Sequence, residues 1–269
     1  MPQHRLGPRD ALSFDHRAPT RDGGVTFVLF NALTGDSAGW EQRIAPALRD
    51  AGHGTLAWNY RGQTGSPFSL DLDFSAGQIV DDALALLRAE APARPVYVGL
   101  SIGGLFAARA HLRGAEALGL VLINTLRRVG PRIEWINDAL VRCAEVGGLE
   151  LLRDLYLPLL MGEPWLGENR AAFLRDTAYA PLPRESGPYR LLASSGTADW
   201  DLPYEELRPP VVVLTGLQDR VFHEPRDVEE LAARLPDARR LDVAGAGHLL
   251  PTERPEAVID ACLGLAGRL

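Results

Sequence analysis

The chain has 269 residues, of which 46% are hydrophobic and 23% are charged, and its formal net charge at pH 7 is −7. This length suits one α/β domain of ordinary size with room for an insertion, and the composition is that of a soluble globular protein. The negative charge argues against a general attraction to nucleic acid or to an anionic membrane surface.

The N-terminal segment, the lack of a long apolar segment and the cysteines bear on the compartment in which the protein is expected. Residues 1–14 contain no apolar run like that of a signal peptide, and no segment approaches the roughly 20 apolar residues that a membrane helix needs. Cys143 and Cys262 are the only cysteines, and without a secretory signal they are expected to be reduced and buried. We therefore expect a cytoplasmic protein without a disulfide framework or zinc site, and the sequence leaves open whether it is a homo-oligomer.

Strand-like segments recur along the chain. Five are continuous apolar runs, at 25–31, 54–60, 96–100, 119–124 and 211–216, and a weaker sixth run spans 239–245. Such runs are typical of strands that are buried on both faces of a parallel sheet. Residues 13–16 are predicted to add an antiparallel edge strand at the start.

Helical patterns lie between these runs, at 75–91, 103–114, 226–236 and 255–267. Strands that alternate with helices in this way predict an α/β fold, in which a mostly parallel, doubly wound sheet carries helices on both faces.

The region 126–201 breaks the alternation, because it contains no strand-like run. Three of its segments have helical patterns, at 131–147, 149–162 and 167–179. We interpret 126–201 as an inserted helical cap and 1–125 together with 202–269 as the core. The simplest alternative is that these helices complete the core itself, but strand-helix alternation resumes cleanly after residue 201, which favours an insertion.

Residues 99–103 read Gly-Leu-Ser-Ile-Gly and match the pattern G-x-S-x-G. The pattern suits a tight strand-to-helix turn with Ser101 at its tip, because bulk two positions before or after the serine would clash in so sharp a bend. The first N–H groups of the following helix would point at the same place and stabilise an oxyanion there. A glycine-rich turn with an N-capping serine is the non-catalytic alternative.

A serine nucleophile needs a base within hydrogen-bond reach and an acid that orients the base. Among six histidines, His248 lies in a glycine-rich loop just after the last predicted strand, and His223 lies in another loop and stays open as an alternative. Asp219 follows the strand 211–216, at the carboxyl end where open α/β sheets place their sites. Ser101, Asp219 and His248 are therefore the candidate catalytic triad, although the last two could each be an ordinary turn or loop residue.

The loop after the first long strand, residues 30–36, is expected to supply a second oxyanion donor. The backbone N–H groups of Leu33 and Ile102 are the candidate pair. An ordinary loop between strand and helix is the alternative.

These features together resemble the α/β-hydrolase superfamily over nearly the whole chain. The resemblance rests on a nucleophile elbow at 96–104, an acid loop at 214–222, a histidine loop at 245–258 and an arginine-glycine turn at 59–66. The segment 126–201 is similar to the helical cap of the esterase, lactonase and haloperoxidase-like branch. A serine nucleophile disfavours the dehalogenase and epoxide-hydrolase branches, which use Asp at that position.

Two features depart from the usual pattern of this family. Asn31 and Ala32 stand where members usually have His-Gly, which bears on loop geometry and substrate placement. The sequence Ala-Leu-Thr-Gly-Asp at 32–36 resembles the corresponding loop of homoserine O-acyltransferases, which pass an acyl group to an alcohol.

The resemblance implies a serine hydrolase that cleaves a carboxylic ester, thioester or lactone of a small to medium substrate through an acyl-enzyme. A small-molecule acyl substrate is the expected partner, nucleic acid and membrane are not, and no cofactor or metal is required. Acyl transfer, C–C bond hydrolysis on the same triad, and non-catalytic ligand binding stay open. The candidate substrate-binding residues of the cap, which could equally pack it onto the core, are Trp135, Tyr156, Leu160, Met161 and Trp165.

Overall fold

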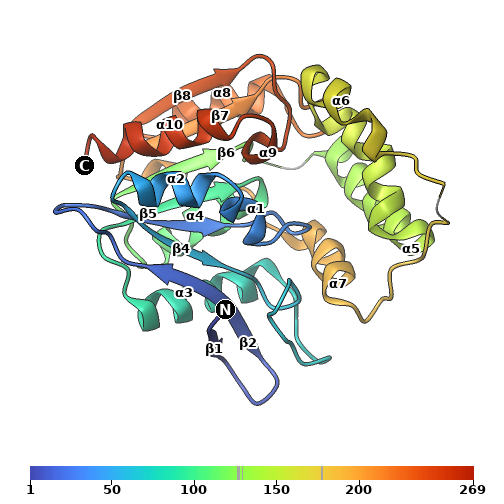
Figure 1. Ribbon diagram of the computed structural model, residues 1–269, viewed down its shortest axis with the longest axis horizontal. Coiled ribbons are helices and arrows are strands. Elements are labelled where there is room, and N and C mark those ends of the chain that lie inside the picture. The colour runs from blue at the N-terminus through green and yellow to red at the C-terminus, as the bar shows by residue number, and fades with distance from the viewer. Residues whose placement is uncertain (126–127, 129, 177) are drawn as a thin grey trace.

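The computed structural model describes all residues except 126–127, 129 and 177. Its centre is an eight-stranded sheet in the order β1-β2-β4-β3-β5-β6-β7-β8 (Figure 1). The first two strands are antiparallel additions at one edge, and the other six run parallel. The mostly parallel α/β class predicted from the sequence is confirmed. The strands are Gln3–Arg5 (β1), Ala11–Arg17 (β2), Thr26–Phe30 (β3), Gly54–Trp58 (β4), Pro95–Leu100 (β5), Gly119–Ile123 (β6), Val211–Gly216 (β7) and Ala238–Val243 (β8).

The strands β3 to β7 are buried on both faces of the sheet, which explains why they are almost continuously apolar. In β3, Phe27 and Leu29 join one core cluster, whereas Val28 and Phe30 join the other. Successive side chains of a strand point to opposite faces, so a strand between two helical layers needs apolar residues at every position.

Helices cover each face of this sheet. One layer packs through α1 (Ala38–Glu41), α2 (Ile44–Asp50), α9 (Leu250–Glu253) and α10 (Pro255–Ala266). The opposite layer packs through α3 (Ala76–Glu90), α4 (Ile102–Leu112) and α8 (Pro225–Arg234). The helices α3, α4, α8 and α10 were predicted. The helices α1, α2 and α9 and the strand β1 were not, because elements this short are too brief to show a clear periodicity.

The segment between β6 and β7 holds α5 (Pro131–Leu160), α6 (Glu163–Asn169) and α7 (Gly187–Ser194), which stand together at one end of the sheet (Figure 1). The two helices predicted at 131–147 and 149–162 are the halves of α5, which bends at Gly148, where φ is 70°. A side chain at Gly148 would collide with the carbonyl oxygen of Ala180, so the bend requires glycine.

The helix predicted at 167–179 is wrong beyond residue 172. The chain leaves helical geometry at Phe173, and Leu174 has a φ of 52°, outside the right-handed helical region. The helix α7 was not predicted, and its Leu191 packs into the same core cluster as α3 and α4. Residue 126, the predicted start of the inserted cap, lies outside the described residues, and the division between cap and core stays a prediction.

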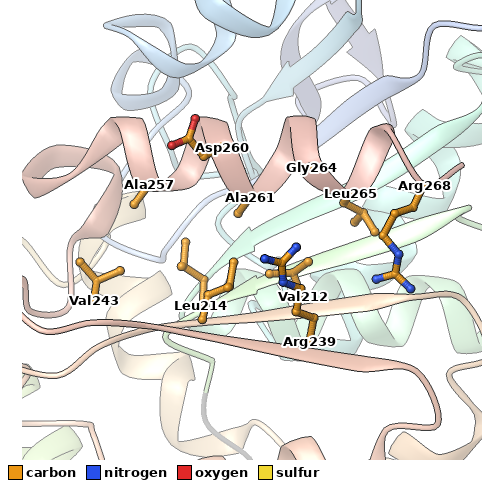
Figure 2. A pocket seen from close by; sticks show the side chains of 11 residues that line it. Val212, Leu214, Arg239, Val243, Ala257, Asp260, Ala261, Gly264, Leu265 and Arg268 are labelled. Carbon is orange, nitrogen blue, oxygen red and sulfur yellow. The ribbon is translucent and has the colours of Figure 1, made fainter.

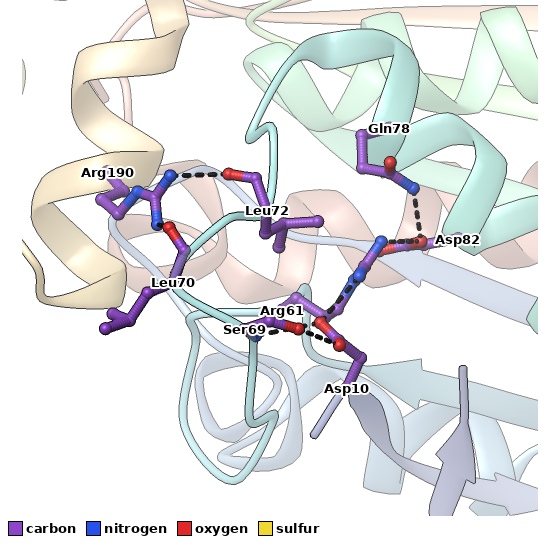
Figure 3. Close-up of polar contacts among 8 residues, drawn as sticks. All are labelled: Asp10, Arg61, Ser69, Leu70, Leu72, Gln78, Asp82 and Arg190. Atoms are coloured by element: carbon purple, nitrogen blue, oxygen red, sulfur yellow. Dashed lines mark hydrogen bonds and ion pairs between the residues drawn. The ribbon is translucent and has the colours of Figure 1, made fainter. Parts of the chain in front are cut away.

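A buried arginine ties the start of the chain to the loop that follows β4. Arg61 donates two hydrogen bonds to Asp82 of α3 and one to Asp10, at 2.7 to 2.9 Å (Figure 3). In the same view Arg190 of α7 donates to the carbonyl oxygens of Leu70 and Leu72. The contacts of Arg61 hold the turn at 59–66, and those of Arg190 attach α7 to the loop that follows this turn.

Neither cysteine is cross-linked. Cys143 and Cys262 are both free and buried, as predicted, and burial raises the pKa of both thiols. Among the residues described, no helix combines the length and the apolar character that crossing a bilayer requires.

Candidate active site

The turn between β5 and α4 holds Ser101 in a backbone conformation that side chains rarely adopt. Its φ is 56° and its ψ is −123°, and its N–H donates to the carbonyl oxygen of Ile123 at 2.7 Å. A side chain at Gly99 would collide with the backbone of Gly103 and Gly104, and one at Gly103 with the carbonyl oxygens of Phe30 and Asn31. Both glycines of the motif are therefore required by close backbone approach, the reason the sequence suggested.

Replacement of Gly103 by alanine is expected to distort this turn. The new methyl group would overlap two backbone carbonyls, which cannot swing aside as a flexible side chain can. We expect a loss of about 1–3 kcal/mol in the free energy of unfolding, measured in urea, together with loss of whatever activity depends on Ser101. Gly264→Ala in α10 is the matched control, because nothing lies within 4 Å of its added methyl group. Native stability and activity in Gly103→Ala would contradict this explanation of the motif.

Asp219 and His248 form a buried pair beyond the ends of β7 and β8. The Nδ1 atom of His248 lies 2.6 Å from Oδ2 of Asp219, and both residues are only 4% exposed. The other carboxylate oxygen, Oδ1, accepts hydrogen bonds from the N–H groups of Val221 at 3.0 Å and Phe222 at 2.9 Å. The carboxylate is thus held by three donors from fixed directions.

Burial raises the pKa of Asp219, but the charge of His248 and the hydrogen bonds from His248, Phe222 and Val221 outweigh burial, so its pKa lies below the ordinary value. A lowered pKa keeps this carboxylate ionised at neutral pH. An ionised acid beside Nδ1 orients the imidazole with its Nε2 free to act as a base.

Ser101 and His248 border the same cavity, and Phe222 also lines it. Among the described residues no hydrogen bond joins the Ser101 hydroxyl to the imidazole, and such bonds often tighten only when substrate is bound. His223, the alternative base, does not line this cavity. Of the two histidines, His248 is the one that combines a carboxylate partner with access to the serine.

Asn124 and Thr125, at the end of β6, connect the parts of this site and were missed by sequence analysis. Asn124 Nδ2 donates to the carbonyl oxygens of Gly247 and His248, at 3.1 and 2.7 Å, and Oδ1 accepts from the N–H of Gly216 at 2.8 Å. Thr125 Oγ1 donates to the carbonyl oxygen of Ser101 at 3.1 Å. The signal was available: Asn124 is the first polar residue after an apolar strand, as Ser101 is, and Asp219 also lies just beyond the end of a strand.

The loop that carries Leu33 is fixed by the side chain at its start. Asn31 Nδ2 donates to Trp58 O and to Gln63 Oε1, and Asn31 Oδ1 accepts from the indole N–H of Trp40 at 2.8 Å. Gln63 Nε2 in turn donates to the carbonyl oxygen of Ala32 at 2.9 Å. The asparagine that replaces the usual histidine therefore anchors this loop to the turn at 59–66. Leu33 and Ile102 both border the cavity beside Ser101.

The cavity has a volume of about 380 Å³ and a mostly apolar lining, within the usual range for small-molecule sites. Side chains from both halves of the bent helix α5, before and after Gly148, form part of its wall. The α5 side chains with apolar character that line it are Ile133, Leu140, Leu149, Leu152, Leu157 and Leu160.

Of the five predicted substrate-binding residues, the structure brings Leu160 to this cavity. Trp135 is 79% exposed on the outer side of α5. Tyr156 packs beside Leu140 in a small cluster of its own, and the ring of Trp165 packs against Phe173. Met161 is buried where the main chain after α5 meets Gly247. The five residues were chosen because they are apolar or aromatic, and that property alone does not tell which side of a helix lines the cavity.

A second hollow of about 270 Å³ lies between α10 and the strands β7 and β8 (Figure 2), and neither Ser101 nor His248 lines it. Arg239, Arg268 and Asp260 are its charged residues, and its lining contains no serine, cysteine or histidine. Within the part of the chain that the structure describes, no cluster of three or more His, Cys, Asp or Glu side chains could hold a metal ion.

Comparison with known proteins places this geometry in context. A model of the alpha/beta hydrolase family matches residues 27–261. RutD from Variovorax paradoxus, named as a candidate carbamate hydrolase, is 26% identical over 199 residues, which cover 73% of this chain and 74% of that protein. The enol-lactonase from Burkholderia xenovorans superposes with a TM-score of 0.78 at 22% identity, covering 98% of this chain and 99% of its own. A thermophilic esterase from Thermogutta terrifontis has a TM-score of 0.77 at 20% identity and covers 99% and 96%.

Proposed function

Because the chain belongs to the alpha/beta hydrolase family, we propose that it is a serine hydrolase that cleaves a carboxylic ester, thioester or lactone through an acyl-enzyme. One observation carries the proposal: His248, which is paired with the buried Asp219 at 2.6 Å, borders the same apolar cavity as a serine on a strained strand-to-helix turn. A surface turn with an ordinary serine would need neither the strain nor the buried pair.

In this mechanism the hydroxyl of Ser101 attacks the carbonyl carbon of the substrate while His248 Nε2 takes its proton. Asp219 holds the imidazole by Nδ1 and stabilises its charged form. The N–H groups of Leu33 and Ile102 bind the oxyanion, and Ile102 offers the first N–H of α4, at the positive end of that helix. His248 then gives its proton to the leaving group and activates a water that releases the acid.

The cavity supports a small to medium substrate with an apolar acyl or alcohol portion. Its volume and apolar lining suit a short chain or a ring. The names of the similar proteins include a lactonase and an esterase, and the candidate carbamate hydrolase adds carbamate esters to the substrates worth testing.

The test is activity-based labelling combined with turnover. A fluorophosphonate probe is expected to label the wild-type protein on the peptide that contains Ser101, as identified by mass spectrometry. 4-Nitrophenyl esters with acyl chains of different length should release 4-nitrophenolate, and short lactones should open. Absence of both labelling and turnover across esters, lactones and carbamates would refute the proposal and favour a ligand-binding role.

Hydrolysis and acyl transfer are separated by product partition. With an alcohol acceptor added to the ester, a hydrolase releases mainly free acid, whereas an acyltransferase forms the new ester faster. The resemblance of residues 32–36 to an acyltransferase loop is the observation that makes this measurement necessary.

A further inference from the structure

One cation interrupts the apolar wall of the cavity beside Ser101. Arg153 lies in the second half of α5, between the lining residues Leu152 and Leu157. Apart from His248, it is the one ionisable side chain among the described residues that line this cavity. Hydrolysis of a wholly apolar ester gives no reason for a guanidinium at this position.

The guanidinium of Arg153 makes few hydrogen bonds for a group with five donors. Its Nη2 donates to Glu150 Oε1 at 3.3 Å, close to the limit for such a bond. Its Nε is buried and has no hydrogen-bond partner among the described residues. Buried donors are nearly always paired in native proteins, but this Nε is enclosed beside Asp154. The Nη end of the guanidinium, to which the described residues offer one long hydrogen bond, is the part that can meet a partner in the cavity.

Asp154 forms a long ion pair with Arg153, on the Nε side of the guanidinium. The carboxylate of Asp154 is almost completely buried, but its Oδ1 lies 3.9 Å from Arg153 Nε, too far for a hydrogen bond. Its Oδ2 accepts instead from the hydroxyl of Tyr179 at 3.1 Å. Asp154 is thus held by Tyr179 at Oδ2 and by the long ion pair at Oδ1, and the Nη groups of Arg153 keep donors for another partner.

We propose that Arg153 binds a carboxylate at the far end of the substrate, so that the preferred substrate is an ester, thioester or lactone whose acyl portion ends in a carboxylate. This inference rests on the proposed function. Guanidinium and carboxylate form two parallel hydrogen bonds, and the leucines around Arg153 contact the methylene chain between the two ends. The formal charges of Arg153, Glu150 and Asp154 sum to −1, so a carboxylate with one charge is opposed less at this place than a phosphate with two.

The test compares two esters of equal acyl length, 4-nitrophenyl hydrogen glutarate and 4-nitrophenyl pentanoate. The wild-type protein is expected to have a kcat/KM about 10–100-fold higher for the glutarate ester, mainly through KM. Arg153→Gln should lose that preference while its kcat/KM for the pentanoate ester stays within about threefold of wild type. Arg153→Lys should recover part of the preference, because a lysine keeps the charge but not the paired geometry. Glu150→Gln should lower KM for the glutarate ester by about two- to fivefold, because it removes a competing carboxylate.

Arg142→Gln is the matched control: it removes the same charge from the same helix, and Arg142 is exposed and lies outside this cavity. It should leave both esters unaffected. Equal kcat/KM for the two esters in the wild type, or an equal loss for both in Arg153→Gln, would overturn the inference.

A binding measurement separates this inference from the proposed function. In Ser101→Ala, calorimetry should show monomethyl glutarate binding at least about 10-fold more tightly than methyl pentanoate, and Arg153→Gln in that background should remove the difference. If labelling and turnover are found without any carboxylate preference, only the role of Arg153 fails. If the preference in binding is found without labelling or turnover, Arg153 is a ligand-binding residue and the hydrolase proposal fails.

Discussion

Ser101→Ala is expected to lower kcat for any ester that the wild type hydrolyses by up to about 10⁶-fold. The methyl group cannot attack the carbonyl carbon, so no acyl-enzyme forms, and the residual rate comes from the oxyanion donors and from substrate binding alone. Steady-state kinetics with a 4-nitrophenyl ester, together with the stoichiometry of fluorophosphonate labelling, measure the loss. The labelled peptide should disappear entirely in the variant.

The fold should survive this change. The hydroxyl of Ser101 makes no hydrogen bond within the described residues, and its N–H and C=O keep their partners Ile123 and Thr125 in alanine. Ser194→Ala is the matched control, because that hydroxyl bonds only to a carbonyl within its own helix and lies outside the cavity. Residual turnover above about one-tenth of wild type in Ser101→Ala would show that another group performs the attack.

Asp219→Asn is expected to lower kcat by about 10⁴-fold, the loss seen when the acid of a serine-protease triad is replaced by its amide. The asparagine side chain fits the same space but presents a neutral amide to His248 Nδ1, and it can donate a hydrogen bond that fixes the wrong tautomer. The imidazole would then turn a protonated nitrogen toward Ser101 and could not take its proton. KM should change little, because Asp219 is buried behind His248 and does not line the cavity.

The same variant should change how stability depends on pH. Because the folded-state pKa of Asp219 is lowered, its ionised form stabilises the native state above the unfolded pKa of about 3.9, and this contribution is lost as pH falls through the folded pKa. The difference in free energy of unfolding between wild type and Asp219→Asn should therefore shrink in acid, as measured by urea unfolding at several pH values. Asp237→Asn, at an exposed ion pair with Arg268, serves as control. A difference that grows in acid would mean that the carboxylate is not held in its ionised form.

The parallel core could be predicted because its strands β3 to β7 are buried on both faces. Residues such as Phe27 and Val28 enter opposite core clusters, so a run that is apolar at every position leaves few alternatives to a central strand. The region around 167–179 could not be predicted in this way. The helical geometry ends there at Phe173 and Leu174, although the sequence in that region has an ordinary helical pattern.

The positions of Ser101, Asp219 and His248 were inferred from one regularity, namely that each follows a strand of a parallel sheet. That regularity also applies to Asn124, which was overlooked because it belongs to no familiar motif. The wall of the cavity was the hardest part to predict. Arg153 and Trp135 lie on one helix, and only the bend at Gly148 and the packing of α5 decide that the first lines the cavity while the second is exposed.

One backbone contact joins the wall of the cavity to the proposed base. The carbonyl oxygen of Leu160, in the last turn of α5, accepts the N–H of His248 at 2.5 Å, and Gly247 packs closely against the same peptide group. The helix that lines the cavity therefore cannot slide along its axis without displacing or releasing the main chain of His248. Any compound that wedges α5 outward would uncouple the imidazole from Asp219 or from Ser101, so inhibition could arise from distortion of the base and need not come from occupation of the space above the serine.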